Sequence, residues 1–429
     1  MNQTLYNTYV QILKDELLVA MGCTEPIAVA YAAAIARNAL NKLPDRVVIE
    51  ASRNIIKNVK SVVVPHTGGL RGLEAACAAG LIAGDATQQL EVISHVTQEQ
   101  IQQIHEYLQQ VPISVEFSQS DHIFDLTITI YHGKHSACVR IVDYHTNVVS
   151  VKHNGQSLMS KEITGKSRDS MADKSLLTVK DIIEFADTVK IEDVEAVLKQ
   201  QISYNMAIAE EGIRHGYGAN IGKVLLHTYG EKDVKIRAKA FAAAGSDARM
   251  NGCELPVVIN SGSGNQGITA SVPVIIYGQE LAVSQETLYR ALVVSNLCTL
   301  HIKEGIGRLS AYCGAVGAGC GAGAGIAYLH GGRYEEIAHT LVNSLAIISG
   351  TICDGAKASC AAKIACAVEA GILGYFMYKD GQQFVNGDGI VKKDVEETIR
   401  CVGILASQGM QETDKEIVKL MIQNSFLCD

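Results

Sequence analysis

The 429-residue chain has few aromatic and charged side chains and contains no tryptophan. Aromatic residues make up 5% of the chain, which argues against a platform of exposed rings for stacking bases or sugars. The 37 lysines and arginines are outnumbered by 45 acidic residues, giving a net charge of −8, and no basic run interrupts the sequence. We therefore expect neither nucleic acid nor an anionic membrane surface as a partner.

Targeting and membrane signals are also weak. The first twenty residues spread their charges through the stretch, which is not typical of a signal peptide, so we expect a cytoplasmic protein. Residues 309–332 contain no acidic side chain, lysine or arginine, but their apolarity comes from alanine and glycine. This composition favours a buried, tightly packed helix over a membrane span.

Glycine and cysteine are abundant instead, with 39 and 12 residues. Alanine and glycine in place of aromatics favour closely packed helices and tight backbone turns. A disulfide scaffold is atypical of so long a chain, and most cysteines stand in apolar runs. We expect reduced thiols that serve either as small apolar side chains or as metal ligands.

Hydrophobic periodicity divides the chain into three parts and predicts an α+β fold. Apolar residues at helical spacing predict two helices over 1–40, which we expect to pack on the C-terminal domain. Short β-branched runs, interrupted by helices at 69–110, predict a small mixed α/β domain over 41–175. Residues 160–178 are polar and form the predicted linker, and helices dominate the larger domain over 176–429.

One glycine-rich segment combines two hydroxyls with two carboxamides: Ser261-Gly262-Ser263-Gly264-Asn265-Gln266-Gly267. Its glycines let the backbone turn tightly and direct several amides to one point, and such a nest suits a carboxylate or a phosphate. We expect a loop between two short strands, at 255–260 and 268–278. An ordinary turn is the alternative interpretation.

A second candidate for anion binding follows a strand predicted at 59–65. There Pro65 leads through His66-Thr67-Gly68-Gly69 into an alanine-rich helix. Amides at the start of that helix could hold an anion, so Thr67 and Gly68 are candidate substrate-binding residues. The alternative is an ordinary connection between a strand and a helix.

Three cysteines stand out by their context. Cys313 opens the glycine run, and Cys353 lies in a predicted loop between Gly350 and Gly355. Cys360 follows after seven residues, which on one unbroken helix would separate the two thiols by about 10.5 Å along the axis. The thiols of Cys353 and Cys360 can converge on a metal only if the chain breaks between them, at Gly355. Spacing alone leaves the core and metal interpretations open.

Cys23 lies directly before Thr24-Glu25-Pro26, which has the features of a helix start. Free amides and the helix dipole favour a thiolate at that position. A thiolate there could be a base, a nucleophile or a metal ligand. A buried thiol between two helices is the alternative.

Four motifs in sequence order resemble the L-cysteine desulfidase family, which carries the iron–sulfur L-serine dehydratase α-type domain. They are Met21-Gly22-Cys23-Thr24-Glu25-Pro26, Ser246-Asp247-Ala248-Arg249-Met250, Asn260-Ser261-Gly262-Ser263-Gly264-Asn265-Gln266-Gly267 and Ile352-Cys353-Asp354-Gly355-Ala356-Lys357. The resemblance covers essentially the whole chain. It implies an oxygen-sensitive 4Fe–4S cluster with one iron open to substrate, and conversion of L-cysteine to pyruvate, sulfide and ammonia without pyridoxal phosphate.

By position, the resemblance implies Cys313, Cys353 and Cys360 as the cluster ligands. The related dehydratases have a longer interval between the second and third ligands, so Cys23 is the alternative third ligand. If Cys23 is not a ligand, it is the candidate catalytic base.

The chemistry of β-elimination adds a requirement for a carboxylate anchor. The neutral donors of Ser261, Ser263, Asn265 and Gln266, with Gly264 between them, are the expected anchor. Arg249 and Lys357 are further anion-binding candidates, with a structural charge as the alternative role for each.

Three other functions remain open from the sequence. The same site could act on L-serine, since iron accepts both hydroxide and thiolate leaving groups. A non-catalytic iron–sulfur or thiol redox sensor and a pyridoxal-phosphate lyase are the rivals from other classes. The oligomeric state is not readable from the sequence, and a homodimer is one open arrangement.

Overall fold

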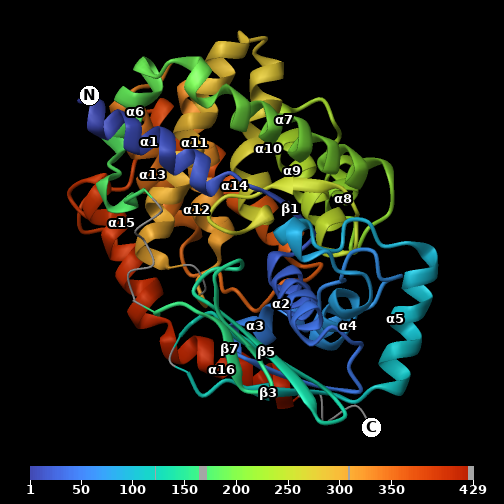
Figure 1. Cartoon of the computed structure of the whole chain (residues 1–429). Helices are drawn as coiled ribbons and strands as arrows, with labels where there is room; N and C mark the ends of the chain where they lie inside the picture. The colour runs from blue at the N-terminus through green and yellow to red at the C-terminus, as the bar shows by residue number, and fades with distance from the viewer. Residues whose placement is uncertain (121, 164–171, 308–309, 424–429) are drawn as a thin grey trace.

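The computed structural model describes residues 1–120, 122–163, 172–307 and 310–423. A bundle of helices occupies one side of the molecule and a β-sheet with its own helices the other (Figure 1). Two separate large hydrophobic cores correspond to these two parts. The expected mixed organisation, with a sheet region and a helical C-terminal part, is confirmed. The boundaries at 40 and 175 stay predictions, and residues 164–171 of the predicted linker lie outside the described residues.

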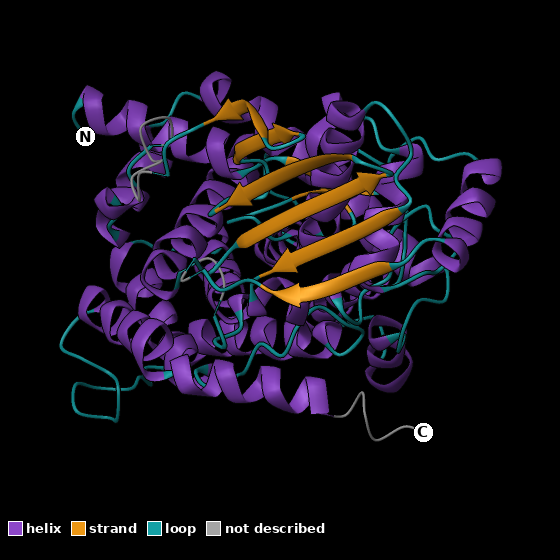
Figure 2. Cartoon of the chain, turned by 60° about the horizontal axis from the view of Figure 1, so that its bottom comes forward, coloured by secondary structure: helices purple, strands orange, loops and turns teal. Residues whose placement is uncertain are grey.

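The main sheet has six strands in the order β3-β2-β4-β5-β6-β7. Among the strand pairs of the described residues, only β2–β3 is parallel. The strands are β2 (Arg46–Ala51), β3 (Ile113–Phe117), β4 (Asp125–His132), β5 (His135–Val142), β6 (Val148–His153) and β7 (Gln156–Ser160). Alternate side chains such as Ile128 and Val139 are buried on the side of α2 (Thr24–Leu40), and α4 (Gly72–Ala83) packs on α2. Figure 2 looks onto the sheet, with helices gathered behind it.

The helices predicted within the sheet region are present, but one predicted strand is not. The expected helical insert corresponds to α4, the short helix η1 (Ala86–Glu91) and α5 (Gln98–Gln110). The predicted strand at 59–65 is wrong: α3 (Arg53–Val59) ends there, and Val63 forms only an isolated bridge to Arg71. Without a neighbouring strand, these β-branched residues have no ladder to join.

The helical part runs from residue 174 to the end of the described chain. Its elements are η2 (Lys174–Leu176), α6 (Val179–Thr188), α7 (Ile191–Arg214), α8 (Ile221–Tyr229), α9 (Val234–Met250), α10 (Gly264–Glu280), α11 (Gln285–Ile306), α12 (Gly314–Leu329), α13 (Tyr334–Ile348), α14 (Cys360–Lys379), α15 (Val395–Ile404), η3 (Leu405–Gly409) and α16 (Gln411–Gln423). The last of these returns to the sheet side, where it contacts α3 (Figure 1).

Helix α12 is the centre of this bundle. Every residue from Ala315 to Leu329 is buried, and α10, α11, α13 and α14 surround the helix. This agrees with the buried helix expected from the alanine and glycine content. Among the described residues, α14 alone is long and apolar enough to cross a membrane, and more than half of its most apolar window is buried within the protein.

The second strand predicted beside the glycine-rich segment is wrong. Residues 255–260 contain the short strand β8 (Pro256–Val258), whereas residues 268–278 belong to α10. Every residue from Gln266 to Gly278 is buried, so this part of the helix has no exposed face. An apolar run without an exposed face has no period that distinguishes a strand from a buried helix.

The two N-terminal helices belong to different cores. Helix α1 (Gln3–Glu16) packs in the helical core through Tyr9 and Leu13, whereas α2 packs against the sheet through Ile27 and Val29. Between them lies the short strand β1 (Val19–Met21), which pairs antiparallel with β8. The N-terminal segment therefore passes from one part of the molecule to the other directly beside the glycine-rich segment.

Candidate active site

A pocket where these parts meet collects most of the candidate residues. Its empty space is about 930 Å³, opening to solvent included. The candidates from the sequence that line it are Cys23, Arg249, Ser261, Ser263, Asn265, Gln266, Cys313, Cys353 and Cys360. Residues from the N-terminus, from α9 and α10, and from the starts of α12 and α14 therefore face one space.

The β1–β8 pair brings Cys23 to the glycine-rich segment. After this pairing the chain turns at Gly22 and begins α2, with Cys23 as the N-cap residue. The hydroxyl of Thr24 donates to the carbonyl oxygen of Gly262 at 2.9 Å. Two segments that are more than 230 residues apart in the sequence are thus joined in the pocket wall.

The expected thiolate at Cys23 is not what its surroundings favour. Cys23 is 3% exposed, and burial raises the pKa of its thiol well above the usual value. The carboxylate of Glu25 raises this pKa further, and the Cys23 thiol donates to Glu25 Oε2 at 3.1 Å. Burial and a nearby negative charge outweigh both the helix dipole and the opposing charge of Arg249, so the ligand-free pocket holds a protonated thiol.

Glu25 is a buried carboxylate that the sequence interpretation passed over. Burial alone would raise its pKa, but His145, the Cys23 thiol and Arg249 outweigh burial and hold the pKa below its usual value. Asn58 Nδ2 donates to Glu25 Oε1 at 3.0 Å, which occupies the second oxygen. Glu25 is therefore a negative charge in the pocket wall, fixed by neighbours on both of its oxygens.

The glycine-rich segment forms the start of α10. Ser261 and Gly262 both have positive φ, at 51° and 75°, which turns the backbone sharply before the helix begins at Gly264. The first N–H groups of a helix have no partner within it and carry the positive end of the dipole. A loop between strands would lack this feature, so the helix makes the segment a better anion site than the sequence predicted.

Arg249 lies beside this helix start. It is 2% exposed, and its Nη1 donates to Asn265 Oδ1 at 3.1 Å. Its Nε is buried and has no hydrogen-bond partner within the described chain. The carbonyl oxygen of the Gln266 side chain is likewise buried and unpartnered there. The pocket thus contains a guanidinium and a carboxamide with unused hydrogen-bonding capacity.

The three cysteines of the predicted ligand set come from two segments that are paired with each other. Tyr312 and Ile352 form an antiparallel bridge, and Cys313 N–H and Cys353 N–H donate to Thr351 and Ala311 carbonyls across it. Cys313 and Cys353 therefore project to the same side as diagonal neighbours. In ladder geometry such neighbours are roughly 7–8 Å apart at Cα.

Cys360 reaches the pocket because the chain turns at Gly355. Gly355 has a φ of 94°, and α14 begins only at Cys360, so Cys353 and Cys360 are not on one helix. Such a break at this glycine is the condition under which the two thiols can converge. The Cys360 side chain also packs against the small cluster that contains Cys23.

The donors that this pocket offers to a metal group are the thiols of Cys313, Cys353 and Cys360. Within the described ranges, no three His, Cys, Asp or Glu side chains are placed to hold one ion. A cluster binds each cysteine through a different iron, so its ligands stand further apart than the ligands of one ion. Burial and then the neighbouring Cys353 thiol raise the pKa of Cys313 to about 12, so metal binding here would release protons.

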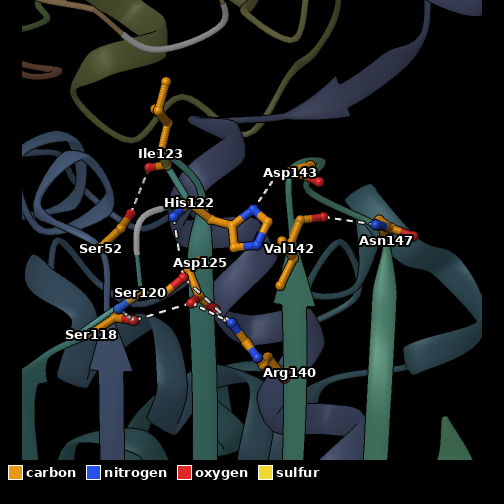
Figure 3. A network of polar contacts seen from close by, with 10 residues as sticks. All are labelled: Ser52, Ser118, Ser120, His122, Ile123, Asp125, Arg140, Val142, Asp143 and Asn147. Atoms are coloured by element: carbon orange, nitrogen blue, oxygen red, sulfur yellow. Dashed lines mark hydrogen bonds and ion pairs between the residues drawn. The ribbon is translucent and has the colours of Figure 1, made fainter. Parts of the chain in front are cut away.

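The sheet contributes a loop to the opposite wall of the pocket. Phe124, directly before β4, and Asp143 and His145, which follow β5, line the space. His122 Nδ1 lies 3.1 Å from Asp143 Oδ1, and Asn147 donates to the Val142 carbonyl at 2.8 Å (Figure 3). These contacts hold the loop that carries Asp143 in place. No sequence motif identified these residues, because they lie in ordinary connections between strands.

Thr67, Gly68 and Lys357 do not line this pocket. Thr67 is fully buried and its hydroxyl donates to the Val64 carbonyl, and Gly68 lies against His105. Lys357 is paired with Asp354 at 2.5 Å. The contacts of these residues are those of ordinary structural groups, whereas the other candidates are brought together.

A family model described as serine dehydratase alpha chain matches residues 87–419. The chain belongs to this family. Among similar proteins, a UPF0597 protein of Desulfitobacterium hafniense is 61% identical over 97% of both chains. UPF0597 proteins of Lachnoclostridium phytofermentans and Treponema denticola are 51% and 44% identical over 97% and 99% of this chain, and over the whole of theirs. The family suggests a lyase-type enzyme, and the names of these relatives specify no substrate.

Proposed function

We propose that the protein is an L-cysteine desulfidase, which eliminates sulfide from L-cysteine and yields pyruvate and ammonia. The observation that carries the proposal is the convergence of Cys313, Cys353 and Cys360 with the start of α10 in one pocket. Serine dehydratase alpha chains generally depend on an iron–sulfur cluster, and the three thiols supply suitable ligands. When bound, a cluster with one open iron would supply a Lewis acid for the leaving group.

The protein's own residues would bind and orient the amino acid. The first N–H groups of α10 and the side chains of Ser261, Ser263, Asn265 and Gln266 provide donors for the carboxylate without adding a second metal ligand. Fixing the carboxylate at this end of the pocket leaves the side-chain sulfur free to extend toward the three thiols. The substrate would then be held at both ends.

Cys23 is the proposed base for the proton on Cα. In the ligand-free pocket its thiol is protonated, so catalysis requires that substrate binding lower its pKa. The substrate ammonium group is a positive charge and shifts the pKa in that direction. Glu25 accepts the thiol hydrogen bond and is placed to receive the proton when the thiolate forms.

The overall reaction is balanced without an oxidant. The Cα–H and Cβ–S bonds break, a Cα–Cβ double bond forms, and the sulfur leaves as sulfide. The resulting aminoacrylate hydrolyses in water to pyruvate and ammonia. Anaerobic assays of pyruvate and sulfide from L-cysteine test the proposal, which fails if the reconstituted protein forms no pyruvate.

L-Serine is the second candidate substrate. The family description names serine dehydratase, and the same arrangement would support loss of hydroxide in place of sulfide. A soft thiolate leaving group suits iron–sulfur chemistry better than hydroxide, which is why L-cysteine is our first choice. Parallel assays with the two amino acids decide between them, and turnover of serine alone would favour the dehydratase.

A further inference from the structure

We infer that Arg249 binds the α-carboxylate of the substrate and restricts the pocket to ligands that carry one. The sequence suggested a structural charge as the alternative role for this residue, and neutral donors as the anchor. This inference rests on the proposed function for the reaction itself. The binding step, however, can be tested without any turnover.

The first argument is that Arg249 is a buried cation without a paired anion. Its side chain is 2% exposed, and its one hydrogen bond, among the described residues, runs from Nη1 to the neutral Asn265. Within the same residues no carboxylate oxygen lies within 4.0 Å of its guanidinium. A buried charge without an anion is unfavourable, and its Nε is left without any partner. An anionic ligand in the pocket would supply the missing counter-charge.

Among the described residues, Glu25 is an acidic residue that interacts electrostatically with Arg249, but its oxygens do not accept hydrogen bonds from the guanidinium. The positive charge of Arg249 helps to lower the pKa of Glu25, so the two side chains influence each other through the pocket. The oxygens of Glu25 accept hydrogen bonds from Cys23, Thr24 and Asn58 instead. Glu25 therefore moderates the charge of the arginine while leaving its donors available.

The second argument is the space made for the guanidinium beside α10. A Cβ added at Gly264 would lie 2.3 Å from Arg249 Nε and 2.8 Å from its Cζ. Glycine at the first position of α10 is thus what allows the guanidinium to lie against the helix start. The unpartnered amides of the helix and the arginine face the same pocket, and they are independent sources of anion affinity.

The expected ligand group is a carboxylate on a small molecule. A guanidinium binds a carboxylate through two parallel hydrogen bonds, which fixes orientation as well as charge. In the proposed reaction, this contact would keep the sulfur end of the substrate directed to the cysteines. A thiol amine that lacks the carboxylate would bind without a fixed direction.

Binding of L-alanine and ethylamine, measured by calorimetry on the anaerobically reconstituted protein, tests this inference. L-Alanine carries the ammonium and carboxylate groups but no leaving group, and ethylamine lacks only the carboxylate. We expect the wild type to bind L-alanine more tightly than ethylamine. Arg249→Gln should weaken L-alanine binding about 10- to 100-fold, the loss typical of a charge-assisted hydrogen bond, and leave ethylamine unchanged.

Two further variants separate charge, geometry and folding. Arg249→Lys keeps the positive charge but not the paired donors of the guanidinium. Its L-alanine affinity should therefore lie between those of the wild type and Arg249→Gln. Arg214→Gln removes an exposed arginine that is paired with Glu210 and should bind as the wild type does. Iron content and melting temperature show whether the Arg249 variants are intact. A wild type that binds both ligands equally overturns the inference without any variant.

Kinetics distinguish failure of this inference from failure of the proposed reaction. If L-cysteine is turned over, Arg249→Gln should raise KM and reduce the preference for L-cysteine over cysteamine. Unchanged preference and unchanged L-alanine affinity in this variant would overturn the inference while the reaction stands. Loss of L-alanine affinity in a protein that turns over nothing would support the anchor and refute the desulfidase.

Discussion

Replacing Gly371 by alanine tests whether the packing of two helices sets the geometry of the cysteines. Helices α12 and α14 run in the same direction, and each begins with a pocket cysteine, Cys313 and Cys360. Where they cross, a Cβ at Gly371 would lie 2.2 Å from the Gly319 carbonyl oxygen. This contact is with backbone, which cannot rotate away as a flexible side chain can.

Two opposing effects determine the size of the change. Alanine in the interior of a helix is favoured over glycine by about 0.5–1 kcal/mol. Overpacking a core costs about 1–3 kcal/mol, and at this distance the helices have to move apart. We therefore expect a net loss of about 1–2 kcal/mol in the free energy of unfolding. The starts of both helices should shift, so iron retained after reconstitution should fall as well.

Denaturant unfolding of the metal-free protein and iron per chain after reconstitution measure these two effects. Gly216→Ala is the control, since the nearest atom to a Cβ there is 3.7 Å away and the backbone is not left-handed. A Gly371→Ala protein that is as stable as the wild type and binds iron fully would refute the close packing and its role in the site.

Three further substitutions address individual groups. Cys313→Ser and Cys353→Ser should each abolish iron binding. The control Cys366→Ser, at an exposed position on α14, should retain iron. Full iron content in both pocket variants would contradict the ligand assignment. Cys23→Ala should retain iron but lower kcat at least about 100-fold, as removal of a general base does. Loss of iron in this variant would make Cys23 a cluster ligand instead. Burial raises the pKa of Asp247 to about 6, above the value of about 3.9 in the unfolded chain. The protonated carboxyl therefore stabilises the folded protein fully below pH ~3.9, and this stabilisation is lost as the pH rises through 6. The free energy of unfolding should therefore fall less between pH 4 and 7 in Asp247→Asn than in the wild type. The same pH dependence in both proteins would contradict this.

Elements that keep an exposed face were predicted from their periodicity, and α12 from its alanine and glycine content, whereas α10, which is buried on all sides, was predicted wrongly. Alternating residues such as Ile128 and Ile130 identify β4, because one side of the sheet is less buried than the other. Helix α10 is buried all round, so its apolar run carried no period and was interpreted as a strand. The three-residue strand β1 is too short for any periodic signal.

The candidate site was predictable residue by residue but not as an arrangement. Local context identified Cys23, Cys313 and Cys353, because each stands at a helix start or a glycine turn. Nothing local indicates that Cys23 and Glu25 would both be buried, or that Arg249 would be buried without gaining a counter-ion. Both depend on the β1–β8 pairing and on the packing of α9 against α10, which are contacts between distant segments.

The most direct test of the central claim is anaerobic reconstitution with iron and sulfide, followed by assays with L-cysteine and L-serine in parallel. We predict pyruvate and an equal amount of sulfide from L-cysteine, with activity lost on exposure to air. Added pyridoxal phosphate should have no effect. A bound cluster with no turnover of either amino acid would contradict the enzyme and favour a redox sensor. Turnover that survives removal of iron would contradict the role proposed for the three cysteines.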